Sequence, residues 1–534
     1  MAGNKNSKTK KQTYLQGAAI LTVAALITKA IGALFKIPLT GMITTEGAGH
    51  FYVAYNIYIV LLNVSSTGLP VAVSHLISQA NTLGRRGEVL AIHRVSLRLF
   101  LLLGLVCGGA MLVFSPQLAS WMRDPEAKYA ITMLAPAVLF VCVSSSYRGY
   151  FQGQQYMTPT AVAQVLEALC KLFLGLAAAY LALRMHLGYA AAAGASILGV
   201  TVGTMLSSIY LSIQYRRKRV RLTLEEASVP VSPTREIVGR ILRIAVPITI
   251  GATGLQIFNA LGSRIILGRL QDALGFTATH ASSQYGIYSM AQTLYLLPSA
   301  LVQSLAVSII PAVTAALALG NRAQGRRMSE SAVRVAGLIA LPFGVGLSVL
   351  AAPIQRLLYR YDSQTLVVAG PTLAILGAAS ILYCLILVTN AILQANGKAS
   401  IPIFTTLAGG IANILVDYFL VGLPQFHILG GALGTLSYCI VALLFNLLAL
   451  KCLVPEPPRV LAQLRKTALA SVPMGVVAWA VYHFAGSVLL AVAASGPLYL
   501  VLVYLFKIIT YYDCRLLPKG EWIARFLRVA PTEE

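Results

Sequence analysis

Long apolar runs, separated by short polar gaps, occupy nearly the whole of this sequence. A helix needs about 20 largely apolar residues to cross the hydrocarbon core of a bilayer, and each run is long enough to do so. The A, V, I, L, M, F, W, Y and C residues make up 57% of the chain and the charged residues only 11%, whereas a soluble domain carries roughly 25% charged residues. This composition excludes a soluble protein, a disordered chain and a secreted disulfide scaffold, and it predicts an all-α polytopic membrane protein.

The runs predict about fourteen membrane helices. They are expected at 14–42, 51–79, 95–116, 129–151, 160–184, 189–214, 239–263, 285–316, 334–352, 364–393, 401–422, 429–450, 467–487 and 493–512. The longest gap between them is strongly basic and covers residues 215–238. The gaps leave no room for a soluble domain.

The net charge of +24 comes from 41 Lys and Arg residues against 17 Asp and Glu residues. Most of the basic residues lie in the tails and in every second gap, which is the distribution expected of cytosolic loops. The opposite gaps hold only Arg123, Lys128, Arg184, Arg264, Arg269, Arg356 and Arg360. We therefore expect a multi-pass membrane protein with both termini in the cytosol and no nucleic-acid partner.

An internal repeat divides the chain. TGLPVAVSHLISQANTLGRRGE from Thr67 resembles LLPSALVQSLAVSIIPAVTAALALGNRAQG from Leu296, and RGYFQGQQYMTPTA from Arg148 resembles NAILQANGKASIPI from Asn390. The offset of about 230–245 residues equals six helices, so the repeats are parallel. We expect an N-terminal lobe in 1–214, a basic cytosolic linker in 215–238, a C-terminal lobe in 239–450, and two added helices with a cytosolic tail in 451–534.

The segment YRGYFQGQQYMTPTAVAQVLE from Tyr147 resembles the one between helices 4 and 5 of stage V sporulation protein B and polysaccharide exporters. EGAGHFYVAYNIY from Glu46 and GLPVAVSHLIS from Gly68 are similar to the same family. The chain is identified as a member of the multidrug/oligosaccharidyl-lipid/polysaccharide (MOP) superfamily, which includes the lipid II flippases. The resemblance implies alternating access and movement of an undecaprenyl-diphosphate-linked saccharide from the inner to the outer leaflet. We expect a monomer in the bacterial plasma membrane whose partners are this lipid-linked saccharide and membrane lipids.

Five charged residues are candidates for binding that substrate. Charges near the bilayer centre are costly and usually face a cavity or a partner. Lys29 and Lys36 are two helical turns apart on one face, and the resemblance places essential arginines of lipid II flippases on this helix. Glu167 and Lys171 are four residues apart in the order that favours an ion pair, so they either neutralise one another or line the cleft. Arg148 opens the turn after the fourth helix, where it either meets a phosphate or bonds to turn carbonyls.

Asn413 and Asp417 lie one turn apart in the eleventh expected helix. Two oxygen ligands on one helix face suit a hard cation, and a polar contact between helices is the alternative. The resemblance adds Thr435 and Asn259 to a sodium site of the kind found in some lipid II flippases. The coupling ion would be Na+ or H+, with no other cofactor.

The expected function is that of a transporter and not of an enzyme. Family arginines are replaced by uncharged residues near Leu62, Asn63 and Thr293, which leaves lipid II and other undecaprenyl-linked sugars open as substrates. The alternatives are a cation-coupled multidrug exporter of the same superfamily and a polytopic membrane glycosyltransferase. The glycosyltransferase would need clustered carboxylates or a histidine on a sizeable loop, which the sequence lacks.

Overall fold

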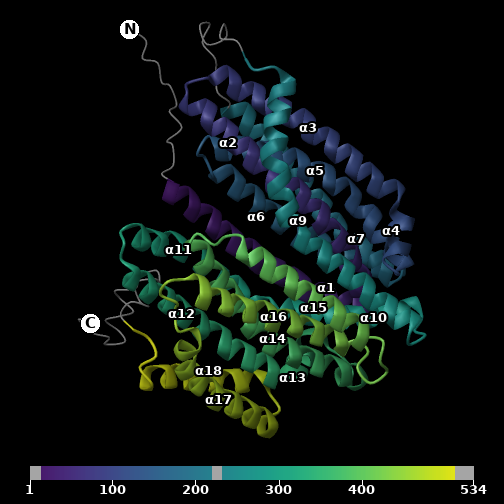
Figure 1. Cartoon of the computed structure of the whole chain (residues 1–534). Coiled ribbons are helices and arrows are strands. Elements are labelled where there is room, and N and C mark those ends of the chain that lie inside the picture. Colours follow the sequence, from purple (N-terminus) through teal and green to yellow (C-terminus); the bar gives the residue numbers. More distant parts are fainter. Residues whose placement is uncertain (1–13, 219–230, 511–534) are drawn as a thin grey trace, which may run out of the picture. The chain divides into compact units, whose positions relative to one another are not determined.

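The computed structural model describes residues 14–218 and 231–510, and all regular structure within these two stretches is helical (Figure 1). The helices divide into two compact units. Unit 1 comprises the residues up to Leu267 together with Thr277–Gly286, and unit 2 comprises Gly268–Phe276 and the residues from Ile287 onward. This border falls at the end of helix α9, whereas the expected lobes, 1–214 and 239–450, meet at the basic segment. The expected division describes the sequence repeat and stays a prediction.

Unit 1 consists of the purple, blue and teal helices of Figure 1. Its elements are α1 (Tyr14–Asn63), a π-helical turn (Val64–Gly68), α2 (Leu69–Thr82), α3 (Arg86–Val113), α4 (Ser115–Trp121), a 3-10 turn (Pro125–Ala127), α5 (Lys128–Gly153), α6 (Thr158–Arg184), α7 (Tyr189–Lys218), most of α9 (Thr234–Asp272) and the first half of α10 (Ala278–Tyr295).

Unit 2 consists of the later, green and yellow helices. Beyond the second half of α10 it holds α11 (Leu297–Ala318), α12 (Arg322–Val349), α13 (Ala351–Tyr359), α14 (Ser363–Ala395), α15 (Ile401–Leu420), α16 (Leu429–Leu453), α17 (Val460–Ala485) and α18 (Val488–Leu505).

The first two expected membrane helices join without a loop. The chain is helical from Tyr14 to Asn63 except at Thr44, whose backbone (φ 61°, ψ −177°) makes a sharp kink. A β-branched residue rarely adopts positive φ, so this conformation marks a definite break between two helical segments. We call residues 14–43 the first arm of α1 and residues 45–63 the second arm. The expected loop over 43–50 is therefore helical on both sides of a kink.

Two of the expected helices are interrupted. The helix expected at 51–79 passes through the π-helical turn, where the hydroxyls of Ser65 and Thr67 donate to backbone carbonyls one turn earlier. The helix expected at 285–316 ends at Tyr295, and α11 begins with Pro298 in its first turn. Hydrogen bonds from side chains to the backbone, like those of Ser65 and Thr67, bend helices without changing their hydropathy.

The sequence repeat is also a repeat in local structure. The turns that follow α2 and α11 both contain a glycine at positive φ, Gly84 (71°) and Gly320 (74°). A residue without Cβ adopts this conformation at little cost. Helices α6 and α15 both begin with a proline in the first turn, Pro159 and Pro402, where the missing N–H is not needed.

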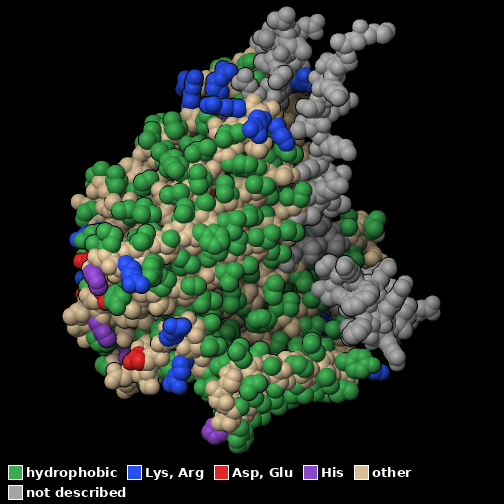
Figure 2. Space-filling model, turned by 180° about the vertical axis from the view of Figure 1, so that it is seen from behind, with side chains coloured by type: hydrophobic (Ala, Val, Ile, Leu, Met, Phe, Trp, Pro, Cys, Tyr) green, Lys and Arg blue, Asp and Glu red, His purple; other side chains and the backbone are tan. Residues whose placement is uncertain are grey.

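The chain is a multi-pass membrane protein. Among the described residues, 11 helices are long and apolar enough to cross a membrane, and the first of them, Ile20–Thr82, contains 63 residues. At 1.5 Å per residue that stretch is about three times the thickness of the hydrocarbon core, and the kink divides it. Large apolar side chains are exposed along the helices, such as Phe173 (66%), Leu102 (60%) and Leu500 (67%), and they cover most of the face shown in Figure 2. The all-α membrane fold is thus confirmed, while the count of fourteen crossings stays a prediction.

Candidate functional site

Two lysines of unit 1 share one tyrosine. The Nζ atom of Lys36, on the first arm of α1, lies 5.7 Å from the ring centroid of Tyr55 and 5.0 Å from that of Tyr52, both on the second arm. The Nζ atom of Lys171, on α6, lies 4.7 Å from the Tyr55 ring and 5.0 Å from that of Phe35. It also donates a hydrogen bond of 3.2 Å to the Tyr55 hydroxyl. We call this group the lysine pair.

The kink in α1 makes this arrangement possible. It folds the second arm back along the first, so that Phe35 packs against Phe51 with ring centroids 6.2 Å apart. Phe51 in turn stacks on Tyr55 at 5.5 Å. Tyr52 and Tyr55 are three residues apart and therefore lie on one helix face, the face that Lys36 contacts. The aromatic rings fix both ammonium groups by cation–π attraction.

The carboxylate of Glu167 is neutralised by Arg148. Nη2 of Arg148, on α5, lies 3.0 Å from Oε2 of Glu167, on α6. Both side chains are partly buried, at 15% and 27% exposure, so this pair is shielded from solvent more than a surface pair. Sequence spacing had left open a pair between Glu167 and Lys171 and bonds from Arg148 to turn carbonyls. In the structure Glu167 and Arg148 bond to one another, and Lys171 contacts aromatic rings.

Lys29 lies apart from the lysine pair. It is on the first arm of α1, two turns before Lys36, and its side chain is exposed. Of the five expected substrate-binding residues, the structure therefore brings Lys36 and Lys171 together at Tyr55 and joins Arg148 to Glu167. The two groups share helix α6, where Glu167 and Lys171 are one turn apart.

A separate polar site lies in unit 2, between α15 and α16. Asp417 is 1% exposed, and its Oδ1 atom has no hydrogen-bond partner among the described residues. A Cβ atom added at Gly434 would collide with this oxygen and would lie 2.7 Å from the Asn413 amide nitrogen. The carboxylate and the amide therefore both fill the space that the missing side chain of Gly434 leaves. Buried carboxylate oxygens are normally hydrogen-bonded or bound to a cation.

The two other residues expected in the cation site have different partners. The Thr435 hydroxyl lies 2.7 Å from the Tyr288 hydroxyl and donates to the Gly431 carbonyl. Asn259 belongs to unit 1, has an exposed side chain and donates to Gln256 at 3.4 Å. Within the described stretches no three His, Cys, Asp or Glu side chains are placed to hold a metal together. Any cation here would depend on Asp417, Asn413 and neutral oxygens.

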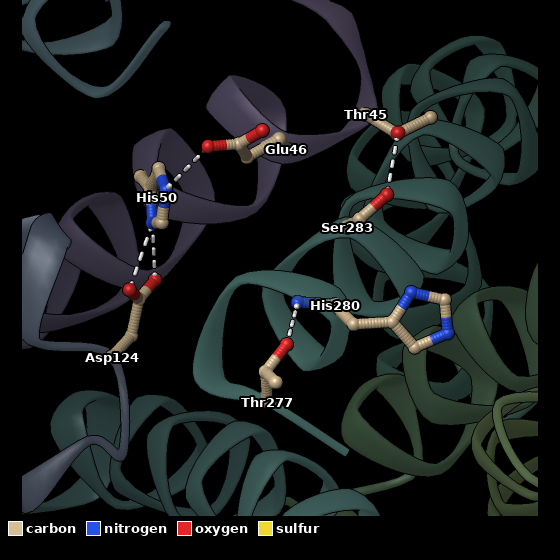
Figure 3. Close-up of polar contacts among 7 residues, drawn as sticks. All are labelled: Thr45, Glu46, His50, Asp124, Thr277, His280 and Ser283. Atoms are coloured by element: carbon tan, nitrogen blue, oxygen red, sulfur yellow. Dashed lines mark hydrogen bonds and ion pairs between the residues drawn. The ribbon is translucent and has the colours of Figure 1, made fainter.

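One buried pair was not predicted. His50, on the second arm of α1, lies 2.8 Å from the carboxylate of Asp124, and both residues are 1% exposed (Figure 3). The two are 74 residues apart, and although His50 lies within the EGAGHFYVAYNIY segment, nothing in a single sequence links it to Asp124. Tyr52 and Tyr55 were missed for a related reason, since only the kink brings them to the lysines.

Comparison with known proteins decides the family. Residues 14–316, more than half of the chain, match the polysaccharide biosynthesis protein family. The chain belongs to this family. The expected resemblance to the MOP superfamily is confirmed, and the polysaccharide biosynthesis family match covers the lysine pair, the Arg148–Glu167 pair and the His50–Asp124 pair.

Relatives of this polysaccharide biosynthesis family protein cover nearly its full length. It is 25% identical to stage V sporulation protein B of Bacillus subtilis, over 95% of this chain and 98% of the relative. It is 23% identical to lipid II flippase MurJ of the same organism, over 91% and 94%. Among solved structures, lipid II flippase MurJ in an inward closed conformation matches with a TM-score of 0.67 at 15% identity, over 91% of this chain and 98% of that one. An inward-facing MATE family multidrug resistance transporter of the MOP superfamily matches with a TM-score of 0.66 at 18% identity, over 80% and 96%.

Proposed function

We propose that the protein is a flippase that carries an undecaprenyl-diphosphate-linked saccharide from the inner to the outer leaflet of the bacterial plasma membrane by alternating access. It is a transporter and not an enzyme in this proposal, and both termini lie in the cytosol. The names of its relatives, a lipid II flippase among them, support a lipid-linked substrate.

The lysine pair is the observation that carries this proposal. Lys36 and Lys171 are held by aromatic rings, while Arg148 neutralises the Glu167 carboxylate one turn from Lys171. Two ammonium groups on one tyrosine repel one another, and the arrangement becomes favourable when an anion binds between them. A diphosphate has the charge and the acceptor oxygens for both, and lysine binds phosphate as a compact point charge.

The charge of the site also favours the flippase over the second candidate. The fold matches a multidrug resistance transporter about as well as it matches a flippase, so a cation-coupled drug exporter is the alternative. Lipophilic drugs of that class are mostly cations, which the lysine pair would repel. Drug efflux that survives removal of both lysines would favour the exporter.

Flipping of a labelled undecaprenyl-diphosphate saccharide in proteoliposomes tests the proposal. We expect Lys36→Ala and Lys171→Ala each to lower apparent substrate affinity by roughly 10- to 100-fold, since a hydrogen bond to a charged group contributes about 1.5–3 kcal/mol. Lys36→Arg should keep most of the activity, because it keeps the charge. Lys128→Ala is the matched control: Lys128 also lies over a tyrosine ring, that of Tyr129 at 4.9 Å, at the start of α5. Equal loss in the control would show that the lysine pair has no special part in binding.

Lys29 belongs to the same proposal as an entry contact. Its exposed side chain lies two turns before Lys36 on α1, so it would meet the diphosphate before the lysine pair does. Lys29→Ala should reduce flipping while leaving insertion intact, because removing a charge from a membrane helix eases insertion.

Depleting the protein in cells and identifying the undecaprenyl-linked intermediate that accumulates on the cytosolic leaflet would name the sugar.

The site of Asp417 and Asn413 is proposed to bind the coupling ion, Na+ or H+. Its support is the buried Oδ1 atom of Asp417, which has no partner among the described side chains. A bound Na+ would take this oxygen as a ligand, and a proton would neutralise it.

A further inference from the structure

The backbone of the second arm of α1 packs directly against the backbone at the start of α10, at Gly49 and Gly286. A Cβ atom at Gly49 would collide with the backbone of Ser282, and one at Gly286 would collide with the carbonyl of Thr45. The hydroxyls of Thr45 and Ser283 lie 2.6 Å apart (Figure 3). All of these residues belong to unit 1. The two helices therefore contact through backbone atoms and short side chains. Because no long side chain fills the space between them, a small rotation of the second arm would open the contact.

The neighbouring face of the same helical turns carries two titratable residues. Thr45 and Gly49 are one turn apart and face α10, while Glu46 and His50 directly follow them and are also one turn apart. The imidazole of His50 lies between two carboxylates, 2.8 Å from Asp124 through Nδ1 and 4.0 Å from Glu46 through Nε2. Figure 3 shows Glu46, His50 and Asp124 in this order.

The two ring nitrogens of His50 differ in their hydrogen bonding. An ionised carboxylate only accepts hydrogen bonds, so Nδ1 carries the proton that it donates to Asp124. The Nε2 atom is buried and makes no hydrogen bond in the described part of the chain. A proton added at Nε2 creates a buried donor and a positive charge, and the nearest acceptor is the Glu46 carboxylate. Glu46 is 36% exposed, so it has room to move the short distance to bond with it.

Other charged or titratable groups surround this end of unit 1. Those contributed by the neighbouring elements are Arg123 beside Asp124, the exposed Glu126 of the 3-10 turn, Lys128 at the start of α5, Tyr189 at the start of α7, Arg264 of α9, which donates to the Trp121 carbonyl at 2.9 Å, and His280 of α10, which is exposed. The two carboxylates are the groups that contact the imidazole directly, so they set the response of His50 to a proton.

We propose that His50, Asp124 and Glu46 form a proton-binding site that controls the contact between α1 and α10. Protonation of His50 draws Glu46 onto Nε2, fixes the first two turns of the second arm, and holds Thr45 and Gly49 against α10. Loss of the proton frees Glu46 and loosens the contact. Histidine is the side chain whose charge ordinarily changes between about pH 5 and 8, which suits this role.

The role of this proton-binding site in transport rests on the proposed function. With the N-terminus in the cytosol, the kink of α1 lies at the extracytoplasmic side. A contact at that side must open for a flippase to release its substrate outward. Acid outside the cell would then keep this side closed.

Disulfide formation between cysteines placed at Thr45 and Ser283 tests the proton site without substrate. The full-length protein, with its seven native cysteines replaced by alanine, is compared with the same protein carrying His50→Gln. Thiol reactivity itself depends on pH. The measured quantity is therefore the cross-linking rate of the protein with His50 divided by the rate of the His50→Gln variant at each pH. We expect this ratio to rise several-fold from pH 8 to pH 5. A ratio that stays constant would overturn the proposal.

Two further variants make the result specific. His280→Gln removes an exposed histidine from α10 at the same end and should leave the pH dependence intact; loss of the dependence in this variant would also overturn the proposal. Glu46→Ala removes the acceptor for Nε2–H and should flatten the response even if His50→Gln does not fold. Flipping is measured separately in the same proteins. A pH-dependent ratio without any flipping would refute the proposed function and leave the proton site standing.

Discussion

At the residue scale, the charged candidates were predictable and their partners were not. The cost of a charge inside the bilayer singled out Lys36 and Asp417 from the sequence alone. Their surroundings depend on Tyr55 and Gly434, an aromatic residue and a glycine of types that are common in any membrane helix. Pairing Lys171 with Glu167 by their spacing was reasonable, but Arg148 of the neighbouring helix lies closer in space.

The shared ring of Tyr55 gives a first prediction. Tyr55→Leu should reduce apparent substrate affinity, because cation–π attraction of about 0.5–2 kcal/mol positions each lysine. Tyr55→Phe keeps the ring and loses only the hydrogen bond of 3.2 Å from Lys171, so it should retain most of the affinity. Binding of the labelled lipid-linked saccharide measures both. A Phe variant as weak as the Leu variant would show that the hydroxyl, and not the ring, matters.

Gly434 gives a second prediction. Gly434→Ala places a methyl group against the Asp417 carboxylate and should displace it, which lowers stability by roughly 1–3 kcal/mol and abolishes any effect of sodium on thermal stability. The matched control is Gly496→Ala on α18, where an added Cβ meets nothing within 4 Å. Thermal unfolding in detergent, with NaCl or choline chloride, measures both effects. An unchanged sodium response in Gly434→Ala would remove Asp417 from the cation site.

At the element scale, hydropathy located the helices well and their breaks poorly. The runs give the length and position of a crossing because the bilayer sets both. The kink at Thr44 and the π-helical turn at Val64–Gly68 depend on packing and on side-chain bonds to the backbone, which do not alter hydropathy. The glycine turns after α2 and α11 lie within the sequence repeat, where Leu-Gly is followed within two residues by an arginine.

One acidic residue fastens the start of α9 to α3. The buried carboxylate of Glu88 lies 3.3 Å from Nη2 of Arg240 and accepts a hydrogen bond of 3.0 Å from Ser232. In unit 2, Glu330 near the start of α12 similarly accepts from the backbone N–H of Arg459 at 3.1 Å, just before α17. Each acidic residue thus attaches the start of a later helix to an earlier helix of the same unit.

We therefore expect Glu88→Gln to lower the free energy of unfolding by roughly 1–2 kcal/mol, because it leaves a partly buried Arg240 with weaker compensation. Glu236→Gln is the matched control. Glu236 contacts the same guanidinium at 2.9 Å but is 56% exposed, so its loss should cost at most about 0.5 kcal/mol. Thermal unfolding of the purified proteins gives both values. Equal effects would mean that burial of Glu88 does not strengthen its attachment to α9.

At the scale of the whole molecule, the class, the fold and the family were predictable, and the border between the compact units was not. Composition and charge distribution determine that the chain crosses a membrane many times. The basic segment 215–238 stays the predicted linker between the repeat lobes, and the compact units divide at the end of α9, which packs within unit 1 through contacts such as Arg264 with Trp121 and Asn56 with Ser263. These contacts join positions far apart in the chain, so composition could not show them.

The charge carried across the membrane gives a last prediction. Outward movement of a diphosphate carries net negative charge toward the positive side over one full transport cycle, so an inside-negative potential assists the cycle by about 2.3 kcal/mol per charge per 100 mV. The empty site with its lysines is drawn back toward the cytosol by the same field. Flipping in proteoliposomes held at a fixed potential should slow when the potential is dissipated. Replacing sodium by choline should slow it further if Asp417 binds Na+, and a rate indifferent to potential would contradict this electrical account.

The Arg264–Trp121 contact has an optical consequence. The sequence holds only three tryptophans, and the guanidinium of Arg264 lies 5.2 Å from the Trp121 ring. Trp479 lies on α17 in unit 2 and stacks on His483, and Trp522 is outside the described residues. Replacing those two by phenylalanine leaves a single indole, three residues from Asp124 and beside a fixed positive charge that shifts its emission. Intrinsic fluorescence of such a protein would follow rearrangement at this end of unit 1 in real time, with no attached dye.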